Sequence, residues 1–160
     1  MTTTKMTGQG PSLAPNLDIC TAAQLAVLGT VINGPAGRQF RYVQFVDAVT
    51  YVAGHIVTRA SATDWVVTND RAGGSNVAGH EVIGMVFQDT VPTQNQFGWV
   101  QCKGISLVAP TGTYAAGDYC IPHATTDGAA VISGYAAAKA DFNIFGKALS
   151  SSRINLGWCA

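Results

Sequence analysis

Short β-rich stretches separated by turn sequences constrain the fold of this chain more than any other feature. From residue 38 onward the stretches are RQFRYVQFV, GHIVTR, DWVVT, EVIGMVFQD, GWVQCKGISLV, DYCIP, AAVIS and INLGW. Between them lie NGPAG, NDRAGGSN, PTQNQ, PTG and TTDG. β-branched and aromatic runs are typical of strands, and clusters of Gly, Pro, Asn and Asp are typical of turns. Many short strands at close spacing predict a mainly β domain, either a barrel or a sandwich.

The first part of the chain has a different character. Residues 1–16 are polar and contain Gly8, Gly10, Pro11 and Pro15, which oppose regular structure. Residues 22–28 fit a short helix capped by Thr21, but LGTVI, residues 28–32, fits a strand equally well. We therefore divide the chain into an extended arm with a possible short helix, residues 1–27, and a β-barrel-like domain, residues 28–160.

Charged residues are scarce. The 160 residues are 48% hydrophobic and only 11% charged, against roughly a quarter in an average protein. A surface with so few charges suggests that other protein covers part of it. Nine basic residues balance nine acidic ones without a basic block, which argues against nucleic-acid binding through phosphates. The apolar run at residues 22–32 is too short to cross a membrane.

A faint internal repeat links the two halves of the sequence. Tyr51 matches Tyr114, Gly54 matches Gly117 and Asp64 matches Asp127, each 63 residues apart. After a shift of one residue, Gly84 matches Gly146. The pattern suggests one β-hairpin unit used twice, with Gly where the backbone bends. Chance is the alternative in a sequence this rich in Ala, Gly and Val.

The stretch FGWVQCKGISLV, residues 97–108, alternates like a strand but has no fully polar face. Side chains alternate across a strand, so small residues from Gly98 on predict a tightly packed inner face. The opposite positions predict a broad, largely aromatic outer face. Aromatic residues anchor protein interfaces, so we expect a second subunit to cover that face. The expected contact residues are Phe97, Trp99, Gln101 and Lys103.

The sequence offers no catalytic or metal-binding motif. The histidines His55, His80 and His123 lack ligand spacing, and we interpret them as turn residues. The scattered carboxylates do not form a recognisable acid–base pair. We interpret the four cysteines as small buried hydrophobic residues, with a disulfide as the next interpretation. We therefore expect no enzyme, no cofactor and no metal site.

The order of the β motifs resembles that of the small decoration, or cement, proteins of tailed bacteriophage heads. The matching elements are LGTVINGPAGRQFRYVQFVDAV, GHIV, VAGHEVIGMVFQDTV, FGWVQCKG, AAGDYCIP and GKALSSSRINLGW, which together span roughly residues 28–158. None of them is a catalytic signature. Their order and spacing carry the resemblance.

The resemblance implies a compact β-barrel or β-tulip domain that forms a homotrimer. Such proteins are made in the host cytoplasm and bind the major capsid protein on the outer surface of the virion head. They add after the shell expands and stabilise it against the pressure of packaged DNA. The family has no active site to transfer, and no direct contact with nucleic acid or membrane is implied.

The N-terminal arm is a further candidate contact with a partner. The arm could add a strand to a capsid edge or cross to a neighbouring subunit, with Met6, Pro11, Leu13 and Pro15 as contacts, or it could be a frayed terminus. Symmetric shell sites would let modest contacts act together.

A carbohydrate-binding β module on a virion or cell surface, with Phe97 and Trp99 stacked on sugar, is the alternative function. A small hydrolase with a dispersed site is a third.

Overall fold

The computed structural model describes residue 17 and residues 20–46, 50–60, 64–70, 81–88, 92–123, 126–133 and 145–157. Within these ranges the chain is almost entirely β structure, with one 3-10 turn, η1 (Pro35–Gly37), and no α-helix. The strands are β1 (Val31–Asn33), β2 (Gln39–Phe45), β3 (Ile56–Arg59), β4 (Val66–Thr68), β5 (Val82–Met85), β6 (Gln96–Ile105), β7 (Gly112–Thr113), β8 (Tyr119–Pro122), β9 (Ala130–Ser133), β10 (Gly146–Ser150) and β11 (Arg153–Leu156). The predicted mainly β fold is confirmed.

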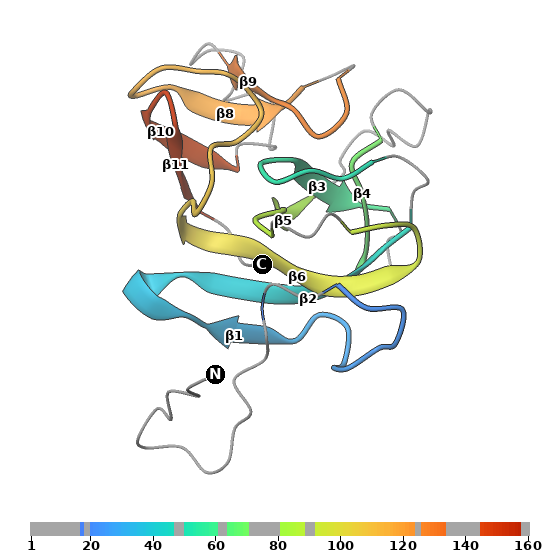
Figure 1. Cartoon of the computed structure of the whole chain (residues 1–160). Helices are drawn as coiled ribbons and strands as arrows, with labels where there is room; N and C mark the ends of the chain where they lie inside the picture. The colour runs from blue at the N-terminus through green and yellow to red at the C-terminus, as the bar shows by residue number, and fades with distance from the viewer. Residues whose placement is uncertain are drawn as a thin grey trace.

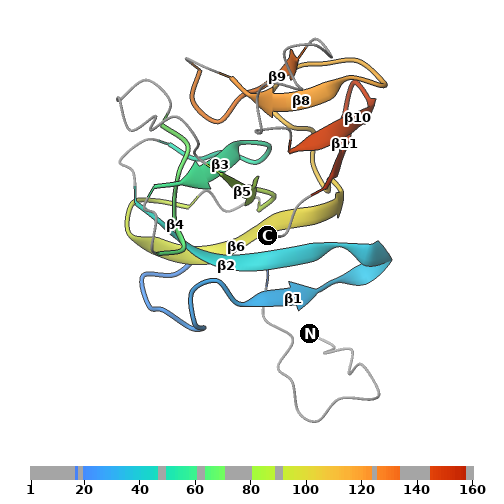
Figure 2. The same cartoon turned by 180° about the vertical axis from the view of Figure 1, so that it is seen from behind.

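Five strands form a closed barrel. The sheet order is β1-β2-β4-β3-β5-β6-β11-β10-β8-β9-β7, and an additional pairing of β2 with β6 closes the ring β2-β4-β3-β5-β6. β2 and β4 run parallel, whereas the other pairs in the ring are antiparallel. Both views of the molecule show β2 and β6 side by side, with β1 outside them and β8 to β11 beyond one end of β6 (Figures 1 and 2).

The side chains of β2 and β6 alternate between an inner face, toward the barrel interior, and an outer face. Val43 lies opposite Gly98 in the ladder, and Tyr42 lies opposite Trp99. Val43 belongs to the barrel interior, whereas Tyr42 and Trp99 belong to a separate aromatic cluster outside it. The small face of residues 97–108 therefore points inward and the large face outward, as the sequence predicts. The interior side chains are Val43, Phe45, Tyr51, Val57, Val67, Ile83, Val86 and Val100.

The internal repeat is confirmed by equivalent backbone hydrogen bonds. Gly54 N–H donates to Val86 O at 2.8 Å, and Gly117 N–H donates to Ala148 O at 2.9 Å. Both glycines have positive φ, 93° and 95° respectively. The strand registers agree as well: Arg59 pairs with Val67 in the first unit, and Pro122 pairs with Ala130 in the second. The two units are residues 39–105 and 112–156.

The topology and the interiors of the two units correspond in the same way. The order β2-β4-β3-β5-β6 matches β7-β9-β8-β10-β11, including a parallel pairing at the start of each. Five buried positions of the first interior have buried counterparts in the second. These pairs are Tyr51 and Tyr114, Val57 and Cys120, Val67 and Ala130, Ile83 and Phe145, and Val86 and Ala148.

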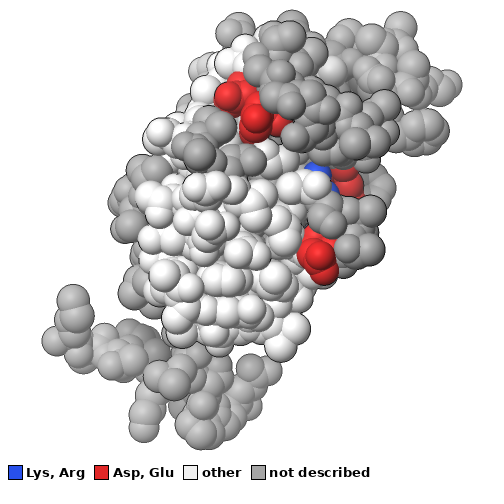
Figure 3. Space-filling view, turned by 90° about the vertical axis from the view of Figure 1, so that its right-hand side faces the viewer, with Lys and Arg blue, Asp and Glu red and all other residues white. Residues whose placement is uncertain are grey.

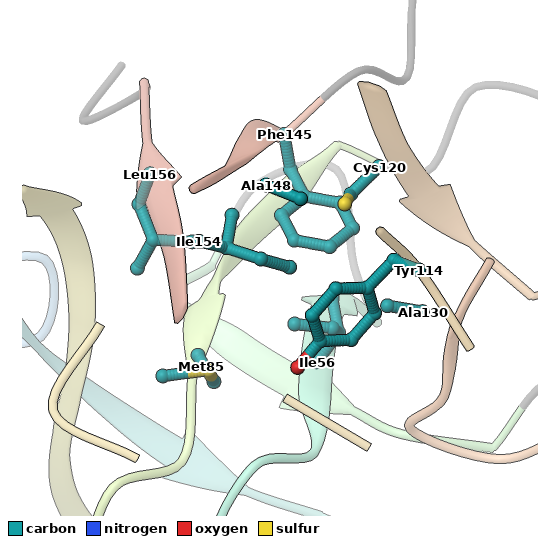
Figure 4. Close-up of a cluster of buried hydrophobic side chains, with 9 residues drawn as sticks. All are labelled: Ile56, Met85, Tyr114, Cys120, Ala130, Phe145, Ala148, Ile154 and Leu156. Atoms are coloured by element: carbon teal, nitrogen blue, oxygen red, sulfur yellow. The ribbon is translucent and has the colours of Figure 1, made fainter. Parts of the chain in front are cut away.

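The described strands of the second unit do not close into a ring of their own. β7 has two residues where β2 has seven, and β11 pairs with β6 instead of β7. Ile56 and Met85 of the first unit complete the second hydrophobic cluster (Figure 4). Figure 4 shows Tyr114, Phe145 and Ile154 converging above these two side chains. The second unit is therefore an incomplete barrel sealed by the first.

Candidate functional site

The aromatic outer face of the barrel is covered by the chain itself. Phe40, Tyr42, Phe87 and Trp99 form a buried cluster, and the Tyr42 and Trp99 ring centroids are 5.0 Å apart. Ala26, Leu28 and Ile32 pack against this cluster. These covering residues belong to residues 20–33, which we call the outer segment.

Hydrogen bonds fix the outer segment on the barrel. Thr21 and Phe97 exchange two backbone hydrogen bonds of 3.0 and 2.8 Å, which form an isolated antiparallel bridge between the outer segment and β6. The Tyr42 hydroxyl accepts the Leu25 N–H at 2.9 Å, and Tyr42 O accepts the Gly29 N–H at 2.8 Å. Residues 20–30 form bends and turns, so the helix considered for residues 22–28 is absent and the strand in LGTVI is limited to β1.

Gly29 lets the outer segment approach the indole of Trp65. A Cβ at Gly29, whose φ is +84°, would lie 2.1 Å from Trp65 Nε1. Two guanidinium groups rest on the same indole, with Arg41 at 3.9 Å and Arg59 at 4.2 Å from the ring centre. Arg59 also forms an ion pair with Glu81 at 3.1 Å. The pKa of Arg41 is lowered, mainly by burial.

The expected contact face is therefore not open to a partner. Trp99 is 4% exposed and Gln101 is fully buried, so the expectation that they lie on an open face is wrong. The alternation in the sequence correctly indicates the aromatic face but does not reveal that residues 20–33 fold back over it. Phe97 is half-buried and Lys103 is exposed. Met6, Pro11, Leu13 and Pro15 lie outside the described residues.

Gln101 has a structural role close to the point where the pairing of β6 changes from β2 to β11. Its Nε2 donates to the carbonyls of Lys103 at 3.1 Å and Ile105 at 2.9 Å, and its Oε1 accepts the Leu107 N–H at 3.0 Å. Gly104 has a φ of +84° and lies against the backbone of Arg38. The buried amide thus ties together the backbone groups on both sides of the bend.

The outer side of the outer segment is exposed and apolar. Leu25 is 74% exposed, Val27 is 75% exposed and Val31 is 40% exposed. No Asp, Glu, Lys or Arg occurs in residues 20–37. Figure 3 views the side of the molecule on which the loop of this segment lies, and its described surface is largely free of charge. These side chains were not among the expected contacts, although the uncharged run that marks them is visible in the sequence.

The described residues do not bring together a metal site. No group of three or more His, Cys, Asp or Glu within the described ranges is arranged to hold an ion. His123 Nδ1 accepts the Thr126 N–H at 3.0 Å, consistent with the predicted turn role. His55 has a more specific environment beside Asn69, and His80 lies outside the described residues.

The cysteines differ from one another. Cys102 is buried, as expected, but it is in a disulfide whose partner lies outside the described residues, so the disulfide interpretation holds for this cysteine. Cys20 and Cys120 are free thiols. Burial raises the pKa of each to about 11, with a further contribution from Asp118 at Cys120. Both thiols are therefore poor nucleophiles in the folded protein.

Comparison with known proteins adds no relative. No protein-family model matches the chain, and no curated protein or solved structure matches it either. Among the described residues, no helix has the length and apolar character needed to cross a membrane.

Proposed function

We propose that this protein is a non-enzymatic decoration protein of a bacteriophage head. In this proposal it assembles as a homotrimer on the major capsid protein, on the outer surface of the expanded shell, and stabilises the shell against DNA pressure. The observation that carries the proposal is the outer segment, which presents Leu25, Val27 and Val31 without an intervening charge. A surface of this kind suits a protein that works in contact with other subunits.

The anchoring of the outer segment supports this role. Leu28 and Ile32 pack inward on the aromatic cluster, while Leu25 and Val27 point outward. Because backbone and hydroxyl hydrogen bonds already hold the segment, a partner meets an ordered apolar surface and little conformational entropy is lost on binding. The outer segment replaces Trp99 and Gln101 as the candidate contact surface in this proposal.

Cosedimentation with phage heads tests the proposal. Purified protein would be mixed with unexpanded and expanded heads built from the major capsid protein of the same genome. We expect saturable binding to expanded heads only, at a stoichiometry of trimers on three-fold sites. Absence of binding to either form would overturn the proposal.

Surface variants test the role of the outer segment. We expect the double substitution Leu25→Ser with Val27→Ser to weaken trimer formation or head binding while leaving the unfolding midpoint nearly unchanged, because both side chains are exposed. Leu149→Ser, at an exposed apolar position on β10, is the matched control and should retain both interactions. Sedimentation velocity reports the trimer, and cosedimentation reports the shell contact.

The carbohydrate-binding alternative rested on an exposed pair of rings. Trp99 is buried against Tyr42 and Phe97 is half-buried, so this pair is not open to a sugar. Glycan-array binding by the intact protein would nevertheless revive that hypothesis if head binding fails.

A further inference from the structure

Two backbone hydrogen bonds of Gly128 join the second unit to the first, and we call this contact the Gly128 clamp. Its N–H donates to Asn69 O at 3.0 Å, and its carbonyl accepts the Ile56 N–H at 2.7 Å. The φ of Gly128 is +63°, and a Cβ there would lie 2.4 Å from Cγ of His55. The imidazole of His55 therefore forms one wall of the clamp, at the start of β3, against the turn that precedes β9.

A buried amide defines the hydrogen-bonding state of His55. Asn69 is 1% exposed, and its Nδ2 lies 2.9 Å from His55 Nδ1 and 3.3 Å from Thr50 O. Thr50 O accepts only, so the atom between the two must be the amide nitrogen. His55 Nδ1 is then an acceptor, and the neutral ring carries its proton on Nε2.

The Oδ1 atom of Asn69 shows why this arrangement does not suit a protonated His55 ring. Asn69 Oδ1 is buried and has no hydrogen-bond partner among the described residues. A proton on His55 Nδ1 would face the Asn69 NH₂ group, donor against donor. Rotating the amide would offer Oδ1 to the ring but would place it against Thr50 O, acceptor against acceptor.

We propose that His55 is a proton-operated latch that holds the second unit on the barrel at neutral pH and loosens the Gly128 clamp on protonation. The proposal goes beyond the proposed function and does not depend on it. Protonation breaks the Asn69–His55 hydrogen bond and charges the ring that fills the space above Gly128. The bistable element is the turn at residues 126–129, docked or released.

Burial, and not the charged groups nearby, sets the direction of the pH dependence. The charged residues on the neighbouring strands are Arg59 of β3, which forms an ion pair with Glu81, and Asp70, which lies two residues after the end of β4. On the turn, Asp127 raises the pKa of His55, but burial outweighs it and the pKa lies below its ordinary value of 6.5. Because the pKa of His55 is lower in the folded than in the unfolded protein, the neutral ring stabilises the fold above pH 6.5. This stabilisation is lost as the pH falls through the pKa of the folded state.

Hydrogen exchange on the full chain tests the latch. Between about pH 7.5 and about pH 5, we expect protection of the Gly128 and Ile56 amides, corrected for intrinsic rates, to fall roughly tenfold or more in the wild-type protein. His55→Gln should abolish that fall, since a glutamine carbonyl can accept from Asn69 without titrating. His123 is the other described histidine; it lies in the second unit, and its Nδ1 accepts the N–H of Thr126 on the same turn. His123→Gln should retain the fall, and loss of the fall in His123→Gln but not in His55→Gln would overturn the proposal. An equal loss of protection in wild type and His55→Gln would overturn the proposal.

Direct observation of the imidazole makes the test independent of any variant. Nitrogen-15 spectra of the wild-type ring should show the proton on Nε2 at neutral pH and a titration midpoint below 6.5. A proton on Nδ1, or a midpoint at or above that value, would refute the latch even if His55→Gln does not fold.

Discussion

Replacing Gly29 by Ala tests how the outer segment is held on the barrel. The residue has a φ of +84°, and the added Cβ would lie 2.1 Å from Nε1 and 2.2 Å from Cδ1 of Trp65. A left-handed conformation costs a residue other than Gly about 1–2 kcal/mol, partly offset by a gain of about 0.4–1 kcal/mol from the stiffer unfolded chain. Overpacking adds about 1–3 kcal/mol, because the indole must leave the two guanidinium groups that it contacts. We therefore expect Gly29→Ala to lower the free energy of unfolding by about 2–4 kcal/mol.

Gly37→Ala separates the backbone effect from the steric one. Gly37 has a φ of +71°, but no heavy atom lies within 4 Å of the position that an added Cβ would take, so this variant should lose only about 1 kcal/mol. Urea denaturation followed by circular dichroism measures both variants. In a Trp65→Ala background, Gly29→Ala should cost no more than Gly37→Ala, because the clashing ring is gone. Equal losses for Gly29→Ala and Gly37→Ala in the wild-type background would refute the packing argument.

The buried groups of the protein lead to four further predictions. Trp99→Ala should lower the free energy of unfolding by about 3–5 kcal/mol in urea denaturation, since Trp99 is a core residue and not an exposed contact. Gln101→Leu should cost about 2–4 kcal/mol and exceed the loss for half-buried Gln44→Leu in the same assay, because it removes the hydrogen bonds of the buried amide to the backbone around Gly104. Iodoacetamide should modify two cysteines of the unfolded, unreduced chain and four after reduction, as mass spectrometry would show, while the folded protein should react slowly. Asp127→Asn should move the His55 titration midpoint to lower pH in nitrogen-15 spectra, because it removes the carboxylate that raises the pKa; an unchanged midpoint would contradict that assignment.

The local features of this protein could be predicted from its sequence. Turn residues and β-branched runs marked most of the strands, and the alternation in residues 97–108 separated the small inner face from the large outer one. The match of Gly54 with Gly117 suggested the internal repeat, and both glycines have the same positive φ in the structure. These features depend on the geometry of a few consecutive residues, which sequence spacing records directly.

What those faces meet could not be predicted in the same way. Residues 20–33 cover Trp99, and Ile56 and Met85 of the first unit fill the opening of the second. The pairing of His55 with Asn69, and the position of Gly128 above the ring, likewise join residues far apart in the chain. An apolar strand face requires a cover but does not specify which segment supplies it, because hydrophobic burial is not directional. Closure of β2 on β6 and the docking of the second unit selected those partners, and both depend on the whole chain at once.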